Sequence, residues 1–378
     1  ICSPVSNCRV SADAGTGILS PCLTGLKVLH MHLLAAFLIR RGLMAALLVA
    51  GLAMVLLAGC GRVETTISGQ TMSTTYMVKV VTDRFAKTRH LRAMIEKRLE
   101  AVSQSMSTYR PDSEISRFNA LDRAGEPFPP SPDFLAVMRE AAKIHTATGG
   151  AWDGTLDPLI TLWGFGREAH SERVPAPDEI ETLLAQVDFG RIVITADGQL
   201  IKGDGRLSLD LASIAKGYGV DGIARMLEDE GYSDFLVEVG GEVYAAGLRP
   251  DGKAWRVGIN RPSREAGYSE VYKVVALTDK GFATSGDYRN YFEVDGRFYS
   301  HILDPKTGYP VTNGVVSASV LADTCTQADG LATALMVMGP EAGLTLVNSL
   351  PGVEALVIVR EAEGGFAEHP SKGFAAES

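Results

Sequence analysis

The chain has 378 residues, of which 46% are hydrophobic and 21% charged, and it carries 40 glycines and 17 prolines. This composition excludes a disordered chain, which would lack the apolar residues that offset the entropy of ordering, and the glycines and prolines exclude a long coiled coil. The formal net charge of −9 argues against a nucleic-acid partner, because such proteins present a basic face to phosphates.

The N-terminal region has the pattern of an export signal. An uncharged apolar run covers residues 42–58 and follows Arg40 and Arg41, and a basic flank before a short apolar stretch is typical of secretory signals. The alternative is an uncleaved transmembrane helix, because about 17 apolar residues are the least that span a bilayer. The residues before the run show no usable pattern, and Met31 and Met44 are alternative start sites.

The apolar run ends in Leu-Ala-Gly-Cys at residues 57–60, which is similar to the lipobox of bacterial lipoproteins. In a lipobox the cysteine becomes the lipidated first residue of the mature chain. We therefore expect residues 1–59 to be an upstream segment and signal peptide, Cys60 to carry the lipid, and residues 61–378 to form the working domain. This predicts a protein of the bacterial cell envelope, lipid-anchored to the periplasmic face of the inner membrane.

Helical and strand patterns alternate in the expected domain. Apolar residues at helical spacing predict helices over residues 88–104, 134–146, 178–187, 213–229 and 326–338. Alternating or β-branched stretches predict strands over residues 67–81, 234–247, 254–260, 271–278, 290–294, 297–301 and 353–359, and a hairpin over 191–209. The Pro-rich residues 110–131 are predicted to be a loop. The whole pattern favours a single α+β unit.

The first polar pattern of interest lies in the last predicted helix. Asp329 and Thr333 are four residues apart and share a helix face. A carboxylate and a hydroxyl one turn apart suit Mg²⁺, which prefers oxygen ligands and often takes only one or two protein carboxylates. The alternative is a capping box, since Thr326 and Asp329 have the spacing of that motif near the start of the helix.

A second pattern joins a strand end to a helix start. Asp210, Ser213 and Lys216 lie where the predicted helix 213–229 begins. A helix N-terminus attracts anions, and a nearby lysine adds positive charge for a phosphate. Asp210 or Ser213 is equally suited to cap the helix.

A third pattern is a histidine beside a rigid turn. His301 ends a predicted strand, and the turn sequence of residues 304–310 follows it. Histidine titrates near neutral pH and serves as a general base, with Asp287 or Asp304 as candidates to orient it. A structural role for His301 is the alternative.

These patterns occur among eight blocks that, taken in order, resemble the ApbE family of FAD:protein FMN transferases over residues 64–360. The blocks cover residues 69–72, 106–119, 148–166, 210–218, 239–242, 284–288, 300–310 and 328–333. The resemblance implies a Mg²⁺-dependent transfer of FMN from FAD to a Thr or Ser hydroxyl of an acceptor protein, with AMP as the leaving group. It also implies an α+β fold in which a single catalytic unit of mixed and antiparallel sheets with packed helices forms two lobes around a flavin cleft.

The partners that the resemblance implies are FAD, an acceptor flavoprotein subunit of the type found in membrane redox complexes, and the membrane surface. Its motifs also assign roles to individual residues. Those that match FAD-contacting positions are Met72, Tyr109, Gly150, Ala151, Trp152, Asp210, Lys216 and Leu303. Ser213, Asp329 and Thr333 match the Mg²⁺ ligands, with a backbone oxygen near Ala215 as a further one. His301 matches the base, so His301 and Asp329 are the predicted catalytic residues.

The sequence departs from the family pattern at three positions and leaves two other activities open. Trp152 stands where phenylalanine is expected, Ala332 where some members carry a second acid, and Lys216 where the charge varies. Tyr109 and Trp152 suit stacking on the flavin or adenine, and core packing is the alternative. A Mg²⁺-dependent FAD pyrophosphatase would use the same residues, and a non-catalytic FAD-binding lipoprotein is the third reading.

Overall fold

The computed structural model describes residues 37–47, 61–166, 173–263 and 270–376. The chain divides into two compact units, residues 1–61 and 62–378. In the first unit, residues 37–47 are helical. Residues 48–58 of the apolar run, the start site Met31 and the expected lipid attachment site Cys60 lie outside the described residues.

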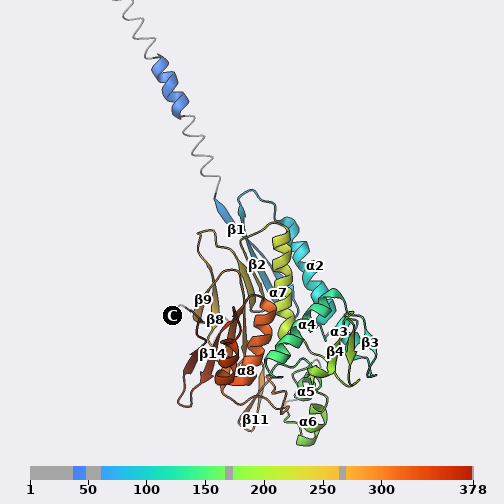
Figure 1. The fold of residues 1–378 in the computed structure, drawn as a ribbon. Coiled ribbons are helices and arrows are strands. Elements are labelled where there is room, and N and C mark those ends of the chain that lie inside the picture. The colour runs from blue at the N-terminus through green and yellow to red at the C-terminus, as the bar shows by residue number, and fades with distance from the viewer. Residues whose placement is uncertain (1–36, 48–60, 167–172, 264–269, 377–378) are drawn as a thin grey trace, which may run out of the picture. The chain divides into compact units, whose positions relative to one another are not determined.

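The second unit is built on an eight-stranded sheet in which every pair of neighbours is antiparallel (Figure 1). Its strands, in spatial order, are β1 (Arg62–Thr71), β2 (Thr74–Asp83), β6 (Phe235–Val239), β7 (Glu242–Ala246), β10 (Lys280–Gly286), β13 (Val315–Ala322), β14 (Glu354–Arg360) and β15 (Phe366–Pro370). The predicted α+β class with antiparallel sheets is confirmed. Two lobes around a flavin cleft remain a prediction.

Two stretches predicted as single strands are hairpins instead. Residues 67–81 fall in β1 and β2, which turn at Met72 and Ser73 with φ of 46° and 58°. Neither residue is a glycine, so the sequence carries no ordinary signal for a turn that needs positive φ. Residues 234–247 form β6 and β7, which turn at Gly240 and Gly241.

Helices cover one face of the sheet. Figure 1 shows α2 (Arg89–Met106), α4 (Pro132–Ala147), α7 (Ala212–Asp229) and α8 (Cys325–Val347) along it. The main core lies between α4, α7, α8 and the sheet, with Phe134, Leu331 and Val320 among its fully buried side chains. All four helices were predicted from their apolar stripes. The ends of α2, α4 and α7 differ by at most two residues, whereas α8 continues nine residues beyond the predicted end at 338.

The other face of the sheet is covered by the hairpin of β8 (Trp255–Asn260) and β9 (Val271–Leu277). Trp255 and Val275 of this hairpin pack with Leu236 and Phe282 of the large sheet. The middle of the large sheet is therefore buried on both faces, which explains why β10 and β13 were not predicted. A strand buried on both faces does not alternate between apolar and polar residues.

The smaller elements connect this framework. They are α3 (Glu114–Asn119), β3 (Pro127–Phe128), α5 (Asp157–Leu162), α6 (Pro177–Leu184), the 3₁₀ turn η1 (Phe189–Arg191), β4 (Ile192–Ile194), β5 (Leu200–Lys202), β11 (Tyr291–Val294) and β12 (Arg297–Ser300). The segment 110–131, predicted to be a loop, contains α3 and β3. Lys202 of β5 helps to hold this segment in place, because its buried ammonium donates to the carbonyls of Asn119 and Leu121 at 3.0 and 2.9 Å.

The C-terminal helix α8 has an interruption and an apolar composition. Gly339 has φ of 77° ahead of Pro340, close to the predicted helix end at 338. Among the described residues, α8 is long and apolar enough to cross a membrane by length and composition. Its side chains instead fill the main core, where Leu331 and Leu335 are no more than 1% exposed. We therefore regard α8 as a core helix.

Candidate active site

The site begins where α7 and α8 touch. The backbone N–H of Gly217 donates to Asp329 Oδ2 at 3.0 Å, and Asp329 is 2% exposed. A Cβ atom at Gly217 would lie 2.4 Å from the carbonyl oxygen of Cys325, so the two helices approach this closely only because the residue is glycine.

Asp329 does not cap its own helix, so the capping-box alternative is wrong. The N-cap of α8 is Thr324, whose hydroxyl accepts from Gln327 N at 3.2 Å. The first backbone donors of α8, those of Cys325 and Thr326, are satisfied by the Asp221 carboxylate of α7 at 2.8 and 2.9 Å. The carboxylate of Asp329 is thus left for another role.

Lys216 links two buried carboxyl groups. Its ammonium lies 3.0 Å from Glu242 Oε1 on β7 and 3.7 Å from Asp329 Oδ1 on α8. Burial opposes the charge of Lys216, but the carboxylates of Asp329 and Glu242 raise its pKa above the ordinary lysine value. Burial raises the pKa of Glu242 and of Asp329, and the charge of Lys216 counteracts that rise. The three side chains form one coupled group, which we call the Lys216 cluster.

Glu242 is the member of this cluster that sequence reasoning missed. It is 5% exposed, and its Oε2 has no hydrogen-bond partner among the described residues. The signal was present, because an acid directly after Gly240 and Gly241 stands where the chain turns back into the core. Predicting residues 234–247 as one strand hid that turn.

The turn at Gly240 borders both the cluster and a cavity. Gly240 has φ of 62°, and a Cβ there would lie 3.3 Å from Lys216 Cδ. The adjoining cavity has a volume of about 380 Å³ and is lined by Thr74, Thr75, Glu238, Gly240, Gly241, Gly258, Asn260, Phe282, Thr284, Gly286, Tyr288 and Arg289. A side chain in place of the Gly240 hydrogen would crowd the lysine, so this turn fixes one wall of the cluster.

The start of α7 brings three predicted residues together. Trp152 Nε1 donates to Ser213 Oγ at 3.0 Å, and Asp210 Oδ1 accepts from Ala212 N at 2.7 Å. The N-cap of α7 is Leu211, without a side-chain cap, so the prediction that Asp210 or Ser213 caps this helix is wrong. Trp152 is 1% exposed and packs edge-to-face on Phe189, so here it is a core residue that presents only its N–H to Ser213.

Thr333 lies one turn beyond Asp329 on α8. Its Oγ1 is 3.1 Å from Ser285 Oγ on β10. Ser285 belongs to the block 284–288 but received no role from the sequence. Two hydroxyls thus lie along the helix face that carries Asp329.

His301 follows β12 and has one ring nitrogen held by backbone. Its Nδ1 is 3.0 Å from the carbonyl oxygen of Asn290, where we expected Asp287 or Asp304. A carbonyl only accepts, so Nδ1 carries the hydrogen and Nε2 is the free base. Burial lowers the pKa of His301, the hydrogen bond to the Asn290 carbonyl partly offsets this, and the charge of Lys216 lowers the pKa again.

The remaining predicted contacts with FAD divide into two sets. Met72, in the β1–β2 turn, reaches α7, because a Cβ at Gly219 would lie 3.6 Å from Met72 Cε. Gly150 has φ of 79°, and Ala151 is 7% exposed beside Trp152. By contrast, Tyr109 is 65% exposed, and Leu303 is buried with Trp163 in a separate apolar cluster. The structure gives no contact that joins Tyr109 or Leu303 to Asp329.

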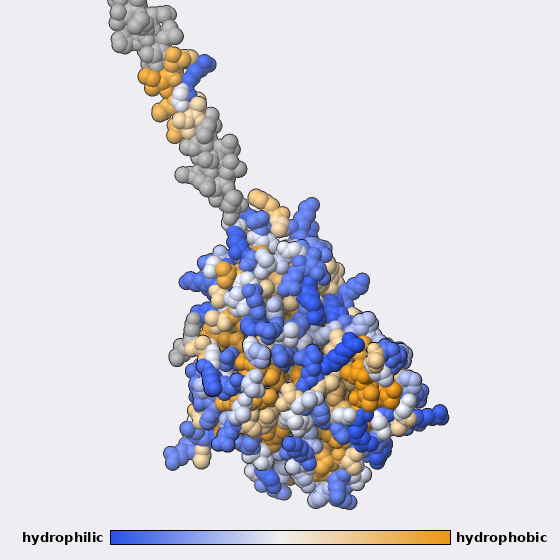
Figure 2. Space-filling view, in the orientation of Figure 1, coloured by the Kyte–Doolittle hydropathy of each residue, from blue (hydrophilic) through white to orange (hydrophobic). Residues whose placement is uncertain are grey.

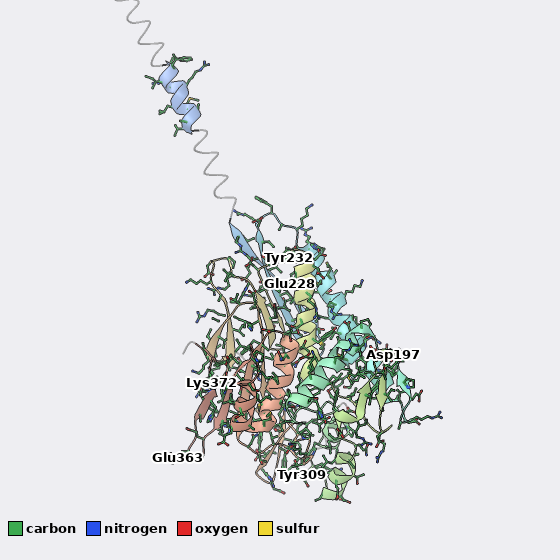
Figure 3. The ribbon with its side chains drawn as sticks, viewed as in Figure 1. Asp197, Glu228, Tyr232, Tyr309, Glu363 and Lys372 are labelled. Carbon is green, nitrogen blue, oxygen red and sulfur yellow. The ribbon has the colours of Figure 1, made fainter. Side chains whose placement is uncertain are left out.

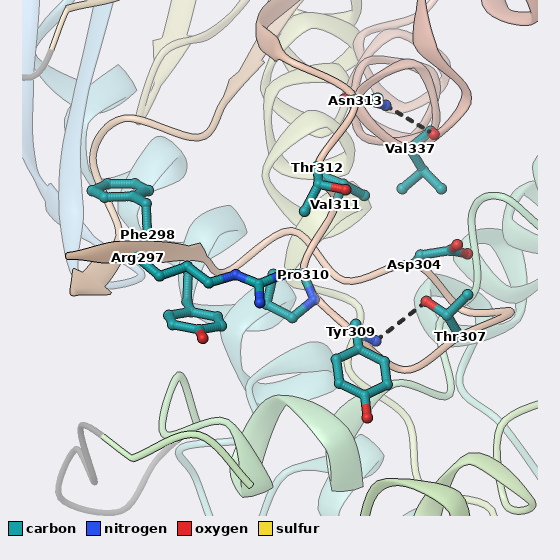
Figure 4. Close-up of a pocket in the computed structure, with 11 residues that line it drawn as sticks. Arg297, Phe298, Asp304, Thr307, Tyr309, Pro310, Val311, Thr312, Asn313 and Val337 are labelled. Atoms are coloured by element: carbon teal, nitrogen blue, oxygen red, sulfur yellow. Dashed lines mark hydrogen bonds between the residues drawn. The ribbon is translucent and has the colours of Figure 1, made fainter. Parts of the chain in front are cut away.

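Most of the residues that line a second cavity closely precede or follow His301 in the sequence (Figure 4). It has a volume of about 450 Å³ and is lined by Arg297, Phe298, Tyr299, Asp304, Thr307, Tyr309, Pro310, Val311, Thr312, Asn313 and Val337. Asn313 Nδ2 donates to the carbonyl of Met336 at 2.9 Å and joins the loop to α8. The predicted turn 304–310 thus forms one wall of this cavity, whose lining does not include His301.

A histidine and two acids form a cluster that contacts the backbone of Trp152. His145, Asp153 and Asp188 offer ligand atoms within 4.8 Å of one another. These atoms are already engaged: His145 Nδ1 with the carbonyl of Trp152 at 3.0 Å, Asp153 Oδ2 with Phe189 N at 2.9 Å, and Asp188 Oδ1 with Gly190 N at 2.9 Å. We interpret this group as a support for the loop that holds Trp152.

Comparison with known proteins identifies the chain's relatives. The model of the ApbE family matches residues 72–357. The chain is 43% identical to an FAD:protein FMN transferase of Vibrio cholerae, over 86% of this chain and 97% of that protein. It is 39% identical to an FAD:protein FMN transferase of Haemophilus influenzae, over 82% and 90%. A solved structure of the flavin transferase ApbE from Vibrio cholerae superposes with a TM-score of 0.76 at 41% identity, covering 83% of this chain and 98% of that one.

Proposed function

Because the chain belongs to the ApbE family, it is an FAD:protein FMN transferase, and we propose that the Lys216 cluster and His301 form its active centre. The observation that carries this proposal is the placement of Asp329. The carboxylate is buried at the α7–α8 contact, is not used to cap its own helix, and faces an ammonium and a second carboxyl group. Ionisable side chains that are buried together and shift one another's pKa values commonly mark a functional site.

The donor set of the site suits a hard divalent cation. Two carboxyl groups face one ammonium, and the buried Oε2 of Glu242 has no partner among the described residues. We propose Mg²⁺, held by Asp329 and Thr333 with Ser213, since Mg²⁺ prefers oxygen ligands. When bound, the ion would neutralise charge on the diphosphate of FAD.

We assign the removal of the proton from the acceptor hydroxyl to His301. His301 Nε2 takes the proton of the acceptor hydroxyl, while the carbonyl of Asn290 holds Nδ1 and fixes the ring. The hydroxyl oxygen forms a bond to the phosphorus of the FMN phosphate, and the bond from that phosphorus to the bridging oxygen breaks. AMP leaves with the bridging oxygen.

One experiment separates this activity from its alternatives. The protein is incubated with FAD and Mg²⁺, with and without a candidate acceptor, and both proteins are analysed by mass spectrometry. A transferase gives an acceptor that is heavier by one FMN, together with AMP. FMN and AMP released at the same rate without acceptor would identify a pyrophosphatase, and FAD binding without turnover would identify a binding protein.

We also propose that the protein is a lipoprotein of the bacterial cell envelope, anchored through Cys60 to the periplasmic face of the inner membrane. The basic flank, the apolar run 42–58 and the lipobox-like end support this. Its acceptor would then be a flavoprotein subunit of a membrane redox complex. Incorporation of labelled fatty acid into the full chain, and its loss in Cys60→Ser, tests the anchor. An unlabelled protein that stays in the membrane would favour a true transmembrane helix.

A further inference from the structure

The loop between β2 and α2 lies beside the point where the chain enters the catalytic domain. Arg62, the first residue of β1, pairs with Asp83, the last residue of β2. In the sequence only Gly61 separates Arg62 from Cys60, so the proposed lipid attachment site is tethered to this strand end by a single residue. Figure 1 shows this loop and the start of β1 at the same end of the domain.

This loop presents an unburied aromatic side chain. The backbone N–H of Ala86 donates to the carbonyl of Asp83 at 3.0 Å, which closes a tight turn with Phe85 at its tip. Phe85 is 82% exposed, and in the described part of the chain no large apolar side chain is more exposed. Figure 2 shows a small apolar patch amid hydrophilic surface at this end of the domain. An exposed phenylalanine on a fixed turn suits insertion into an interface.

Exposed cations predominate on both sides of Phe85, with Asp83 as the acid of the loop. Arg84, Lys87 and Arg89 are exposed, and within the described ranges none of them forms an ion pair. Of the acids near the loop, Asp234 pairs with Arg62 and Glu230 lies 3.5 Å from His90, whereas Asp83 is exposed and forms no ion pair among the residues that the structure describes. The acidic end of α7, marked by Glu228, lies below this loop in Figure 3.

The start of α2 adds to the positive potential. The first turn of α2 contains no acidic residue, and Thr88 provides no side-chain cap. Arg89 therefore stands at a helix N-terminus, where cations oppose the helix dipole, while Arg92 in the same turn pairs with Glu96 at 3.3 Å. This arrangement does not stabilise the isolated domain, but an anionic surface against it would relieve the repulsion.

We propose that Arg84, Phe85, Lys87 and Arg89 form a membrane-contact surface that binds anionic lipid headgroups, with Phe85 inserted among them. The inference rests on the proposed lipid anchor at Cys60, and it adds the orientation in which the anchored domain lies on the membrane. A lipid chain held close to a basic patch binds far more firmly than either alone. Each cation near an anionic surface contributes roughly fivefold to binding.

The buried native tryptophans make a direct test feasible. The sequence has three tryptophans, and Trp152, Trp163 and Trp255 are no more than 2% exposed. In the full lipidated chain, Phe85→Trp would supply an exposed reporter. On vesicles of phosphatidylglycerol and phosphatidylethanolamine, we expect its emission to shift to shorter wavelength and to be quenched by lipids with brominated acyl chains. The matched control is Val193→Trp on β4, where Val193 is 53% exposed, and it should show neither effect.

A charge variant and a flotation assay complete the test. Replacing Arg84, Lys87 and Arg89 together by glutamine in the Phe85→Trp protein should abolish the shift, and should weaken the lipid-dependent component of binding by roughly a hundredfold. A Phe85→Trp protein that floats with the vesicles while its introduced indole stays unquenched would overturn the contact surface and leave the anchor intact. A protein that does not float would overturn both. Flavin transfer to a soluble acceptor is measured alongside and should be unchanged in each variant.

Discussion

The hydrogen bond from Gly217 N to Asp329 Oδ2, at 3.0 Å, fastens α7 to α8 with the same carboxylate that we propose for the cation. The packing of the two helices and the position of that carboxylate are therefore one structural feature. A change that separates the helices must also move Asp329 relative to Lys216.

Gly217→Ala tests this coupling. The added Cβ would lie 2.4 Å from the backbone oxygen of Cys325 and 2.9 Å from Asp329 Cβ, so the helices must shift. We expect a loss of about 1–3 kcal/mol in the free energy of unfolding and weaker Mg²⁺ binding. Thermal unfolding and titration calorimetry measure the two effects. A variant with full stability and full affinity would show that the close approach is not needed.

Asp329→Asn should remove cation binding and keep the fold. Asparagine retains an oxygen for Gly217 N but loses the charge, so we expect at least a tenfold loss in Mg²⁺ affinity with a small change in melting temperature. The control is Glu363→Gln, because Glu363 is an exposed acid. Equal affinity in Asp329→Asn and in the control would place the cation elsewhere.

Glu242→Gln asks whether the second carboxyl group contributes. The amide oxygen can still accept from Lys216, which lies 3.0 Å from Oε1, while the negative charge disappears. We expect weaker Mg²⁺ binding than in the parent protein and an intact Lys216 contact, measured by calorimetry and by melting temperature. Unaltered Mg²⁺ affinity would limit Glu242 to holding Lys216.

The elements that frame the site were largely predictable, whereas its contacts were not. The helices α2, α4 and α7 were predictable because each buries an apolar stripe against the core, and α8 was predictable as an apolar segment that is buried on most sides. The turn at Met72 and Ser73 was missed because two non-glycine residues adopt positive φ there. No local pattern predicts such a conformation, since the rest of the fold imposes it.

The choice between the two readings of Asp329 depended on a residue far away in the sequence. Its spacing from Thr326 fits a capping box, but Asp221 of α7 satisfies the first donors of α8 instead. Likewise Glu242 became part of the site only once β6 and β7 were seen as a hairpin. Local patterns in a single sequence do not predict contacts of this kind, which join residues that are far apart in the chain.

The titration of His301 should determine how the rate of FMN transfer falls at low pH. Burial lowers its pKa below the ordinary value of 6.5, the bond to the Asn290 carbonyl offsets only part of this, and the charge of Lys216 lowers the pKa again. The base acts when neutral, so transfer should stay constant through neutral pH and fall only as the pH drops below the ordinary imidazole range. His301→Ala should remove that limb and lower transfer by about 10²–10⁴-fold, with a much smaller change in FAD affinity. Equal losses of transfer and of FAD affinity would make His301 a binding residue.

Trp152→Phe separates the bond to Ser213 from core packing. Phenylalanine keeps an aromatic ring against Phe189 but cannot donate to Ser213 Oγ, which now receives that bond at 3.0 Å. We expect a cost of about 0.5–1.5 kcal/mol in the free energy of unfolding and a modest change in Mg²⁺ affinity, because Ser213 loses the group that orients its hydroxyl. Ser213→Ala is the companion variant. If Trp152→Phe and Ser213→Ala each weaken cation binding but their effects do not add, the bond acts through the serine; additive effects would mean that Trp152 acts on the site independently.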